Sequence, residues 1–333
     1  MCVYEDMLAN VKLEYLDYVE LFLDFVAPFL NLYFLVLLRK TIFHLNLRIL
    51  LGNFALGLCF LTIFRIPLLL DTFFEFLKDL PNIETFLHIV HNSFVILIVD
   101  GAILLTVERV FATVYADKYE HVVYTHVTVF SSCVLWIFNF GIAFMSQMRM
   151  NQSFVVGNLV IYGEGAMKTP VDLIILLVLN IVSVLIFFIL LFTSSYNRRQ
   201  YRVSSADQQL TQRYQLSENI RTGRQLSRLM IANVIISSYI FVSLYFLSLN
   251  ENRNFWTTFV TGFYEFVCSL ACVLFPLILI WTHPKLKMTF LSHFSRKKKI
   301  DAMRTINDLP LIVKQNAQQQ KQLYFDELKK SWK

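Results

Sequence analysis

The sequence predicts an all-α fold, a bundle of seven membrane-spanning helices. Hydrophobic residues make up 56% of the 333 positions and charged residues only 16%, and the mean hydropathy is +0.54. A soluble domain carries about 45–50% apolar and about 25% charged residues, because polar groups must cover its surface. This composition excludes a soluble enzyme, a disordered chain and a collagen-like or disulfide-rich scaffold.

Seven apolar stretches are long enough to cross a bilayer, whose hydrocarbon core requires about 20 helical residues. The third stretch is the least uniform, because four polar residues interrupt it, although 94–105 is almost continuously apolar. Residues 1–295 are therefore predicted to form one transmembrane domain. Residues 296–333 are predicted to form a cytoplasmic tail that is first basic and then rich in glutamine. The seven predicted spans are 18–38, 47–70, 86–110, 125–145, 171–195, 229–249 and 255–281.

The distribution of Lys and Arg predicts the orientation. Of the 30 basic residues, 24 lie on one side of the predicted spans, five on the other and Arg65 within the second span. Because cytoplasmic segments retain positive charge, the N-terminus is expected outside and the C-terminus inside. The first 17 residues lack the basic start and apolar core of a cleavable signal, so the first span is expected to direct insertion. Asn151 begins a glycosylation sequon on the outer side, in the predicted loop after the fourth span.

The sequence shows no sign of catalysis. It has no glycine-rich phosphate loop, metal-ligand motif or nucleophile elbow, and no loop long enough to form a catalytic domain. We therefore expect neither an enzyme nor a cofactor. Cys268 and Cys272 lie one turn apart and are interpreted as small packing residues; metal binding is the less favoured alternative, because no histidine is near them.

Ionisable residues inside the predicted spans are the main functional candidates, because such groups are costly in a bilayer unless they find a partner. Asp24, Arg65 and Glu265 lie at similar depths in the outer half. We hypothesise that Arg65 pairs with Glu265 or Asp24 in an outward-facing cavity, which makes these three the candidates for a ligand pocket. The alternative is that Arg65 and Asp24 extend to the interface. The full set is Glu20, Asp24, Arg65, Asp100, Glu108, Arg109 and Glu265.

The third span carries two further candidates in its inner half. Asp100 is expected to be buried, neutral and hydrogen-bonded to a buried polar neighbour such as Asn53; participation in switching is the alternative. Glu108 and Arg109 stand at the inner end. An acidic residue beside an arginine either locks the arginine within the protein or releases it to a cytosolic partner. The alternative is an ordinary interfacial charge pair.

The inner side supplies a surface for such a partner. Within the predicted third inner loop, 196–228, residues 211–226 indicate a basic, partly amphipathic helix that contains Arg213 and Arg221 and runs into the sixth span. After the seventh span, apolar residues recur every four positions from Leu286 and a basic run follows, which predicts a short helix lying on anionic lipid. Nucleic-acid binding is not favoured for a juxtamembrane basic run.

Two inner motifs resemble the nematode serpentine chemoreceptors, a group of G-protein-coupled receptors. Residues 108–113, followed by Tyr119 and Glu120, are similar to the signature that ends their third helix. Residues 213–221 are similar to the third-inner-loop motif of class e, the Sre family. Weaker similarities occur at 44–51 and at His283-Pro284. The related Sra and Srb classes are the alternatives.

This resemblance, over about 18–295, implies a chemosensory receptor of the plasma membrane, in a sensory neuron, that detects an odorant, pheromone or other small molecule. It also implies signalling to a heterotrimeric G protein, with Glu108 and Arg109 as the switch. The chain departs from rhodopsin-like receptors: the third helix has no outer cysteine, the sixth has no internal proline, and the seventh has Phe275-Pro276 in place of Asn-Pro. The alternative function is a multi-pass transporter or ligand-gated channel, which would require a polar path across the bundle.

Overall fold

The computed structural model describes residues 2–40, 42–115, 125–153, 170–203, 210–250 and 255–294, and all regular structure in these ranges is helical. Residues 1–290 form one compact unit and 291–333 a second. The predicted tail, 296–333, lies outside the described residues. The helices are α1 (Cys2–Leu38), α2 (Leu45–Phe74), α3 (Pro81–Asp100), α4 (Ala102–Val114), α5 (Thr125–Ser153), α6 (Pro170–Val203), α7 (Leu210–Leu249), α8 (Phe255–Thr282) and α9 (Pro284–Phe294).

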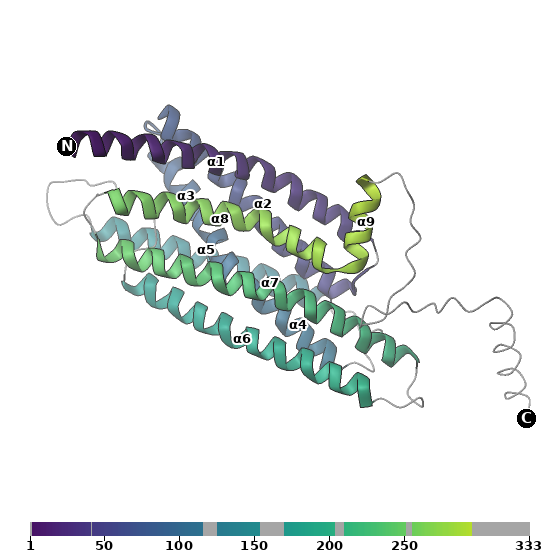
Figure 1. Cartoon of the computed structure of the whole chain (residues 1–333). Helices are drawn as coiled ribbons and strands as arrows, with labels where there is room; N and C mark the ends of the chain where they lie inside the picture. The colour runs from purple at the N-terminus through teal and green to yellow at the C-terminus, as the bar shows by residue number, and fades with distance from the viewer. Residues whose placement is uncertain are drawn as a thin grey trace, which may run out of the picture. The chain divides into compact units, whose positions relative to one another are not determined.

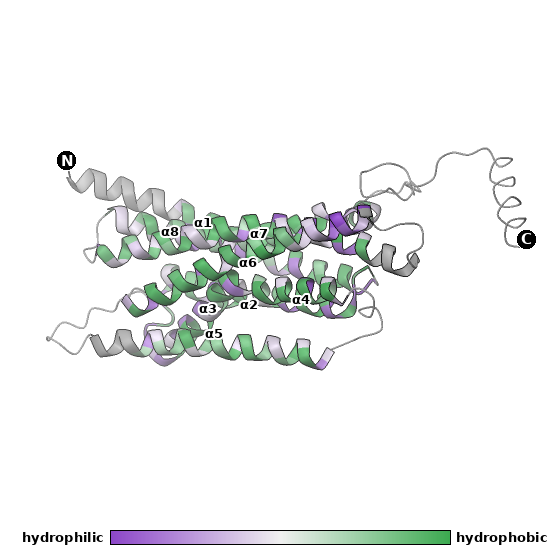
Figure 2. Cartoon of the chain, turned by 90° about the horizontal axis from the view of Figure 1, so that it is seen from below, coloured by the Kyte–Doolittle hydropathy of each residue, from purple (hydrophilic) through white to green (hydrophobic). Residues whose placement is uncertain are grey.

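The long helices lie side by side in a bundle and alternate in direction (Figure 1). α1 packs against α2 and α8, and α7 packs against α6 and α8. Six helices, α1, α2, α5, α6, α7 and α8, are long and apolar enough to cross a membrane. Apolar residues cover most of their length (Figure 2). The third predicted span falls on α3 and α4 together, which completes the seven-span bundle.

The third span is two helices rather than the single helix predicted for 86–110. The break is at Gly101, whose φ of −58° and ψ of −23° are right-handed helical values and whose N–H donates to the Leu97 carbonyl (2.8 Å). A Cβ atom at Gly101 would lie 2.9 Å from the ring of Phe54. The same atom would lie 2.5 Å from the backbone carbonyl oxygen of Leu97, so the helix geometry at the break and the approach of α2 both leave no room for a side chain. The chain continues into α4 across this contact.

The two helices that flank the predicted third inner loop extend beyond the predicted membrane spans. α6 continues to Val203 and α7 begins at Leu210, so most of 196–228 is helical rather than a loop. The predicted helix at 211–226 is the first part of α7, continuous with the sixth span as expected. α5 likewise runs to Ser153, which places Asn151 in its last turn and not in a loop. In all three cases the helix passes beyond the apolar segment, because hydropathy marks the membrane and not the helix end.

Polar side chains join the helices inside the apolar core. Asn31 of α1 donates to the carbonyl of Cys272 in α8 (2.9 Å), and Gln225 of α7 donates to the carbonyl of Leu279 in α8 (2.7 Å). Such bonds are worth about 0.6–2 kcal/mol in a membrane, where water does not compete for the groups. Cys268 and Cys272 are fully buried in this core, in packing positions.

Candidate functional site

Two polar clusters lie inside the bundle, one in each half. We name the half that contains Arg65 the Arg65 end and the half that contains Arg109 the Arg109 end. The Arg65 end lies where α3, α6 and α8 begin, and the Arg109 end lies where α4 and α6 finish and α7 begins. The predicted orientation puts the Arg65 end outside.

At the Arg65 end, one guanidinium group joins three helices. Nε of Arg65, in α2, donates to Oε1 of Glu20 in α1 at 2.6 Å, and Nη1 lies 3.7 Å from Oε1 of Glu265 in α8. His91 of α3 adds a fourth helix, because its Nε2 lies 3.3 Å from Oε2 of Glu265. We name Glu20, Arg65, His91 and Glu265 the Arg65 cluster. Each carboxylate of this cluster lies within 4 Å of the guanidinium, which lowers the cost of placing these charges in lipid.

The sequence hypothesis gave Arg65 two partners, Glu265 or Asp24. The structure places Glu265 beside Arg65 but gives the shorter contact to Glu20, which was recognised only as a charge within the span. Asp24 is fully buried one turn further along α1 and forms no ion pair with Arg65 among the described residues. His91 was seen only as an interruption of the apolar pattern, and no sequence signal linked it to Glu265.

The side chains of this cluster differ in exposure. Glu20 is fully buried, whereas the side chains of Arg65 and Glu265 are 14% and 15% exposed. The exposed part of the cluster therefore belongs to the guanidinium of Arg65 and the carboxylate of Glu265.

At the Arg109 end, a buried arginine joins α4 to α7. Its Nε and Nη2 donate to the two carboxylate oxygens of Glu108 at 2.5 and 2.6 Å. Its Nη1 donates to the hydroxyl of Thr222 (2.8 Å) and to Oδ1 of Asn219 (3.3 Å). Asn219 in turn donates to the carbonyl of Ala112 (3.1 Å). We name Glu108, Arg109, Asn219 and Thr222 the Arg109 cluster.

This arrangement holds Arg109 inside the protein. Its side chain is only 5% exposed, and the bidentate pair with Glu108 uses the strong fork geometry of arginine and carboxylate. Asn219 and Thr222 lie within the segment predicted to contact a partner, but no sequence pattern indicated that they bind Arg109. Movement of α7 would remove two acceptors from the guanidinium group.

The other inner candidates are placed nearby. Arg221 of α7 lies 4.0 Å from Glu218 as an i,i+3 pair, and Glu218 also lies 3.6 Å from the buried His283. Arg213 is in the first turn of α7, and the position of its side chain is outside the described residues. In α9, Leu286 is fully buried and Phe290 packs edge-on against Tyr33 of α1, so the apolar side of this helix contacts the bundle.

Asp100 has a different partner from the one predicted. It is 1% exposed, as expected, but its Oδ1 accepts a hydrogen bond from Asn139 of α5 at 3.2 Å. Asn53, the predicted partner, is only half-buried, and no hydrogen bond joins it to Asp100 among the described residues. A buried, hydrogen-bonded Asp100 is therefore found as expected, but with Asn139 and not Asn53, because depth along a span does not determine which neighbouring helix a side chain faces.

Comparison with known protein families identifies the chain. Residues 77–333, well over half of the sequence, match the family described as Sre G protein-coupled chemoreceptor. The match includes the Arg109 cluster and Glu265, whereas Glu20 and Arg65 precede it. No curated protein matches the chain. With its multi-pass helical bundle and this match, the chain belongs to the Sre family of G protein-coupled chemoreceptors.

Proposed function

We propose that this receptor binds a small molecule at the Arg65 cluster and signals to a heterotrimeric G protein from the Arg109 end. The observation that carries the proposal is the tie between Arg109 and α7. A buried arginine whose acceptors come from two helices has two discrete arrangements, bound or released. In the structure it is bound.

The charge distribution supports the Arg109 end as the cytoplasmic end. The side of the membrane that contains the Arg109 end has 24 basic residues, and the other side has five. Seven of the 24 lie in the segment between the fifth and sixth spans. Positive charge is retained on the cytoplasmic side during insertion. It also attracts anionic lipid and acidic surfaces of partner proteins. We propose 196–228, with Arg213 and Arg221, as the G-protein surface in the plasma membrane.

The third span connects the two clusters. His91 on α3 and Arg109 on α4 are 18 positions apart, a separation of about 27 Å along a helix. A ligand at Glu265 and His91 contacts the same span whose other end holds the switch. The ligand activates the receptor only if it binds more tightly to the conformation in which Arg109 is released.

The experiment is a calcium or cyclic-nucleotide assay in cells that express the full chain, challenged with a panel of odorants and pheromones. We expect a response that Arg109→Ala abolishes, that G-protein blockade abolishes, and that Arg39→Ala, a matched loss of an exposed arginine, leaves intact. A response that persists in Arg109→Ala and under G-protein blockade would contradict the proposal. Ligand-induced current without G protein would favour the channel alternative.

A further inference from the structure

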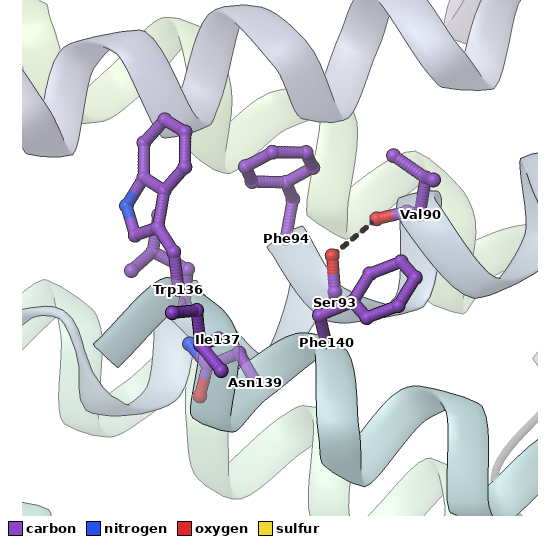
Figure 3. A pocket seen from close by; sticks show the side chains of 8 residues that line it. Val90, Ser93, Phe94, Trp136, Ile137, Asn139 and Phe140 are labelled. Atoms are coloured by element: carbon purple, nitrogen blue, oxygen red, sulfur yellow. Dashed lines mark hydrogen bonds between the residues drawn. The ribbon is translucent and has the colours of Figure 1, made fainter. Parts of the chain in front are cut away.

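A cavity of about 260 Å³ lies between α3 and α5, and no member of either polar cluster lines it. Most of its wall is aromatic or aliphatic, as Figure 3 shows. Phe94 and Trp136 form one side and pack edge-to-face, with ring centroids 5.5 Å apart. The lining residues are Val90, Ser93, Phe94, Leu97, Trp136, Ile137, Asn139 and Phe140.

The rim of the cavity faces the bilayer. α5 lies at one edge of the bundle (Figure 2), and two residues of the rim, Ile137 and Phe140, are 72% and 41% exposed. Asn139 lies 14 residues after the start of the apolar part of α5, Thr125–Met148, and nine before its end, about 21 and 14 Å along the helix, so the cavity lies within the membrane. A molecule that reaches it therefore comes from the hydrocarbon phase and not from water.

The polar groups in the wall are directed into the protein. The hydroxyl of Ser93 donates to the carbonyl of Val90 (2.6 Å), and the amide of Asn139 donates to Asp100 (3.2 Å). Nε1 of Trp136 and Oδ1 of Asn139 are buried and have no hydrogen-bond partner among the described residues. The rest of the accessible wall is nearly all carbon, so a ligand with several polar groups would lose more hydration than these two atoms replace.

The volume sets the size of the occupant. An apolar cavity of about 150 Å³ is large enough to bind benzene, so 260 Å³ corresponds to a molecule of about ten carbon atoms. A whole phospholipid is several times larger. We propose that the cavity between α3 and α5 is a binding site for an apolar small molecule of this size that enters from the bilayer.

Such a molecule lies beside the hydrogen bond that joins α5 to α3. Asn139 both lines the cavity and donates to Asp100, which directly precedes the break at Gly101. A bound molecule therefore contacts Asn139, which is hydrogen-bonded to the last residue of α3 at its junction with α4. The site is separate from the Arg65 cluster, so it does not depend on ligand binding there.

The test uses the full chain in phosphatidylcholine nanodiscs, with a diazirine derivative of naphthalene as photoreactive probe and unlabelled naphthalene as competitor. We expect saturable labelling of peptides from α3 and α5, which excess naphthalene reduces at least fivefold. Ile137→Trp, which fills the rim from an exposed position, should abolish the saturable part. Val127→Trp is the matched control, since Val127 is 60% exposed on the same helix, outside the lining.

Val90→Phe fills the cavity from α3 and provides an independent variant. Its folding is checked by the melting temperature before labelling. Labelling that rises linearly with probe, or is equal in Ile137→Trp and Val127→Trp, would overturn the proposal. So would labelling of the same residues by a lipid with a mid-chain diazirine that naphthalene does not displace, because a lipid chain would then be the occupant.

Discussion

Nη1 of Arg109 donates to the hydroxyl of Thr222 at 2.8 Å, which joins residues of α4 and α7 that are 113 positions apart in the chain. Arg109 is buried, and its Nε and Nη2 are both directed at Glu108. The bond to Thr222 and the longer one to Asn219 are therefore two contacts of the guanidinium that change when α7 moves relative to α4.

The first prediction is that Thr222→Val raises the basal activity of the receptor. Valine keeps the shape of threonine but removes the acceptor, and a hydrogen bond between membrane helices is worth about 1 kcal/mol. The ratio of released to bound Arg109 should therefore rise about fivefold. The measurement is G-protein activation without ligand, normalised to surface expression.

Ser227→Ala is the control for this variant. The Ser227 hydroxyl donates to the Gly223 carbonyl within α7, so its loss removes a hydrogen bond without separating two helices. We expect basal activity to stay at the wild-type level. Equal activities in Thr222→Val and wild type would show that this bond does not restrain α7.

The second prediction concerns the order of the partners of Arg65. Glu20 lies 2.6 Å from the guanidinium and is fully buried, whereas Glu265 lies at 3.7 Å and also contacts His91. Removing one partner of a buried ion pair costs about 3–5 kcal/mol, because the other charge is left unpaired. We expect Glu20→Gln to lower the melting temperature of the purified receptor more than Glu265→Gln does.

Double-mutant cycles with Arg65→Gln measure the two coupling energies directly. The coupling with Glu20 should be the larger. Lys78→Gln is the control, since Lys78 pairs with Glu75 at the surface, where both side chains are more than 70% exposed. A surface pair contributes little, so its loss should leave the melting temperature unchanged. A larger coupling for Glu265 would contradict the geometry.

The sequence predicted the spans because the cost of leaving polar groups in lipid forces long apolar segments. It also placed Arg65 and Glu265 at one level, since depth follows from 1.5 Å per residue. It could not choose among partners at that level. Glu20 and Asp24 are one turn apart on the same face of α1, about 6 Å in depth, and which of them meets Arg65 depends on the vertical offset and tilt of α1 against α2, which hydropathy does not report.

The same limit explains Asp100 and the break beside it. Its depth and burial followed from the sequence, but Asn139 and Asn53 belong to different helices, and only the packing of α3 against α5 selects one. Gly101 read as an ordinary residue of an apolar run. Its role depends on the exact course of the backbone, which brings the Leu97 carbonyl close, and on the approach of Phe54 from α2, a contact between distant parts of the chain.

The third prediction is that Gly57→Val destabilises the contact between α2 and α3. A Cβ atom at Gly57 would lie 2.0 Å from Cδ2 of Leu97, so either the side chain or the helix must shift. Overpacking of this kind costs about 1–3 kcal/mol. The melting temperature should fall, and Leu97→Ala should restore part of it in the double variant, because it removes the opposing atoms.

Gly141→Ala is the matched control, since no atom lies within 4 Å of a Cβ at that position. Alanine is about 1 kcal/mol better than glycine inside a helix, so this variant should be at least as stable as wild type. Equal losses of stability in Gly57→Val and Gly141→Ala would show that the helix interface is not the cause.

The fourth prediction tests the partner of Asp100. Asn139→Leu removes the amide that donates to its carboxyl group and leaves that group buried without this bond. Leaving a buried polar group unsatisfied costs about 1–3 kcal/mol, so we expect a clear fall in the melting temperature.

Asn53→Leu makes the same chemical change on α2 at a half-buried side chain and should have a smaller effect. Asp100→Leu combined with Asn139→Leu should recover stability relative to Asn139→Leu alone, because both members of the pair are then apolar. If Asn53→Leu were the more damaging single variant, α2 rather than α5 would hold Asp100 in place.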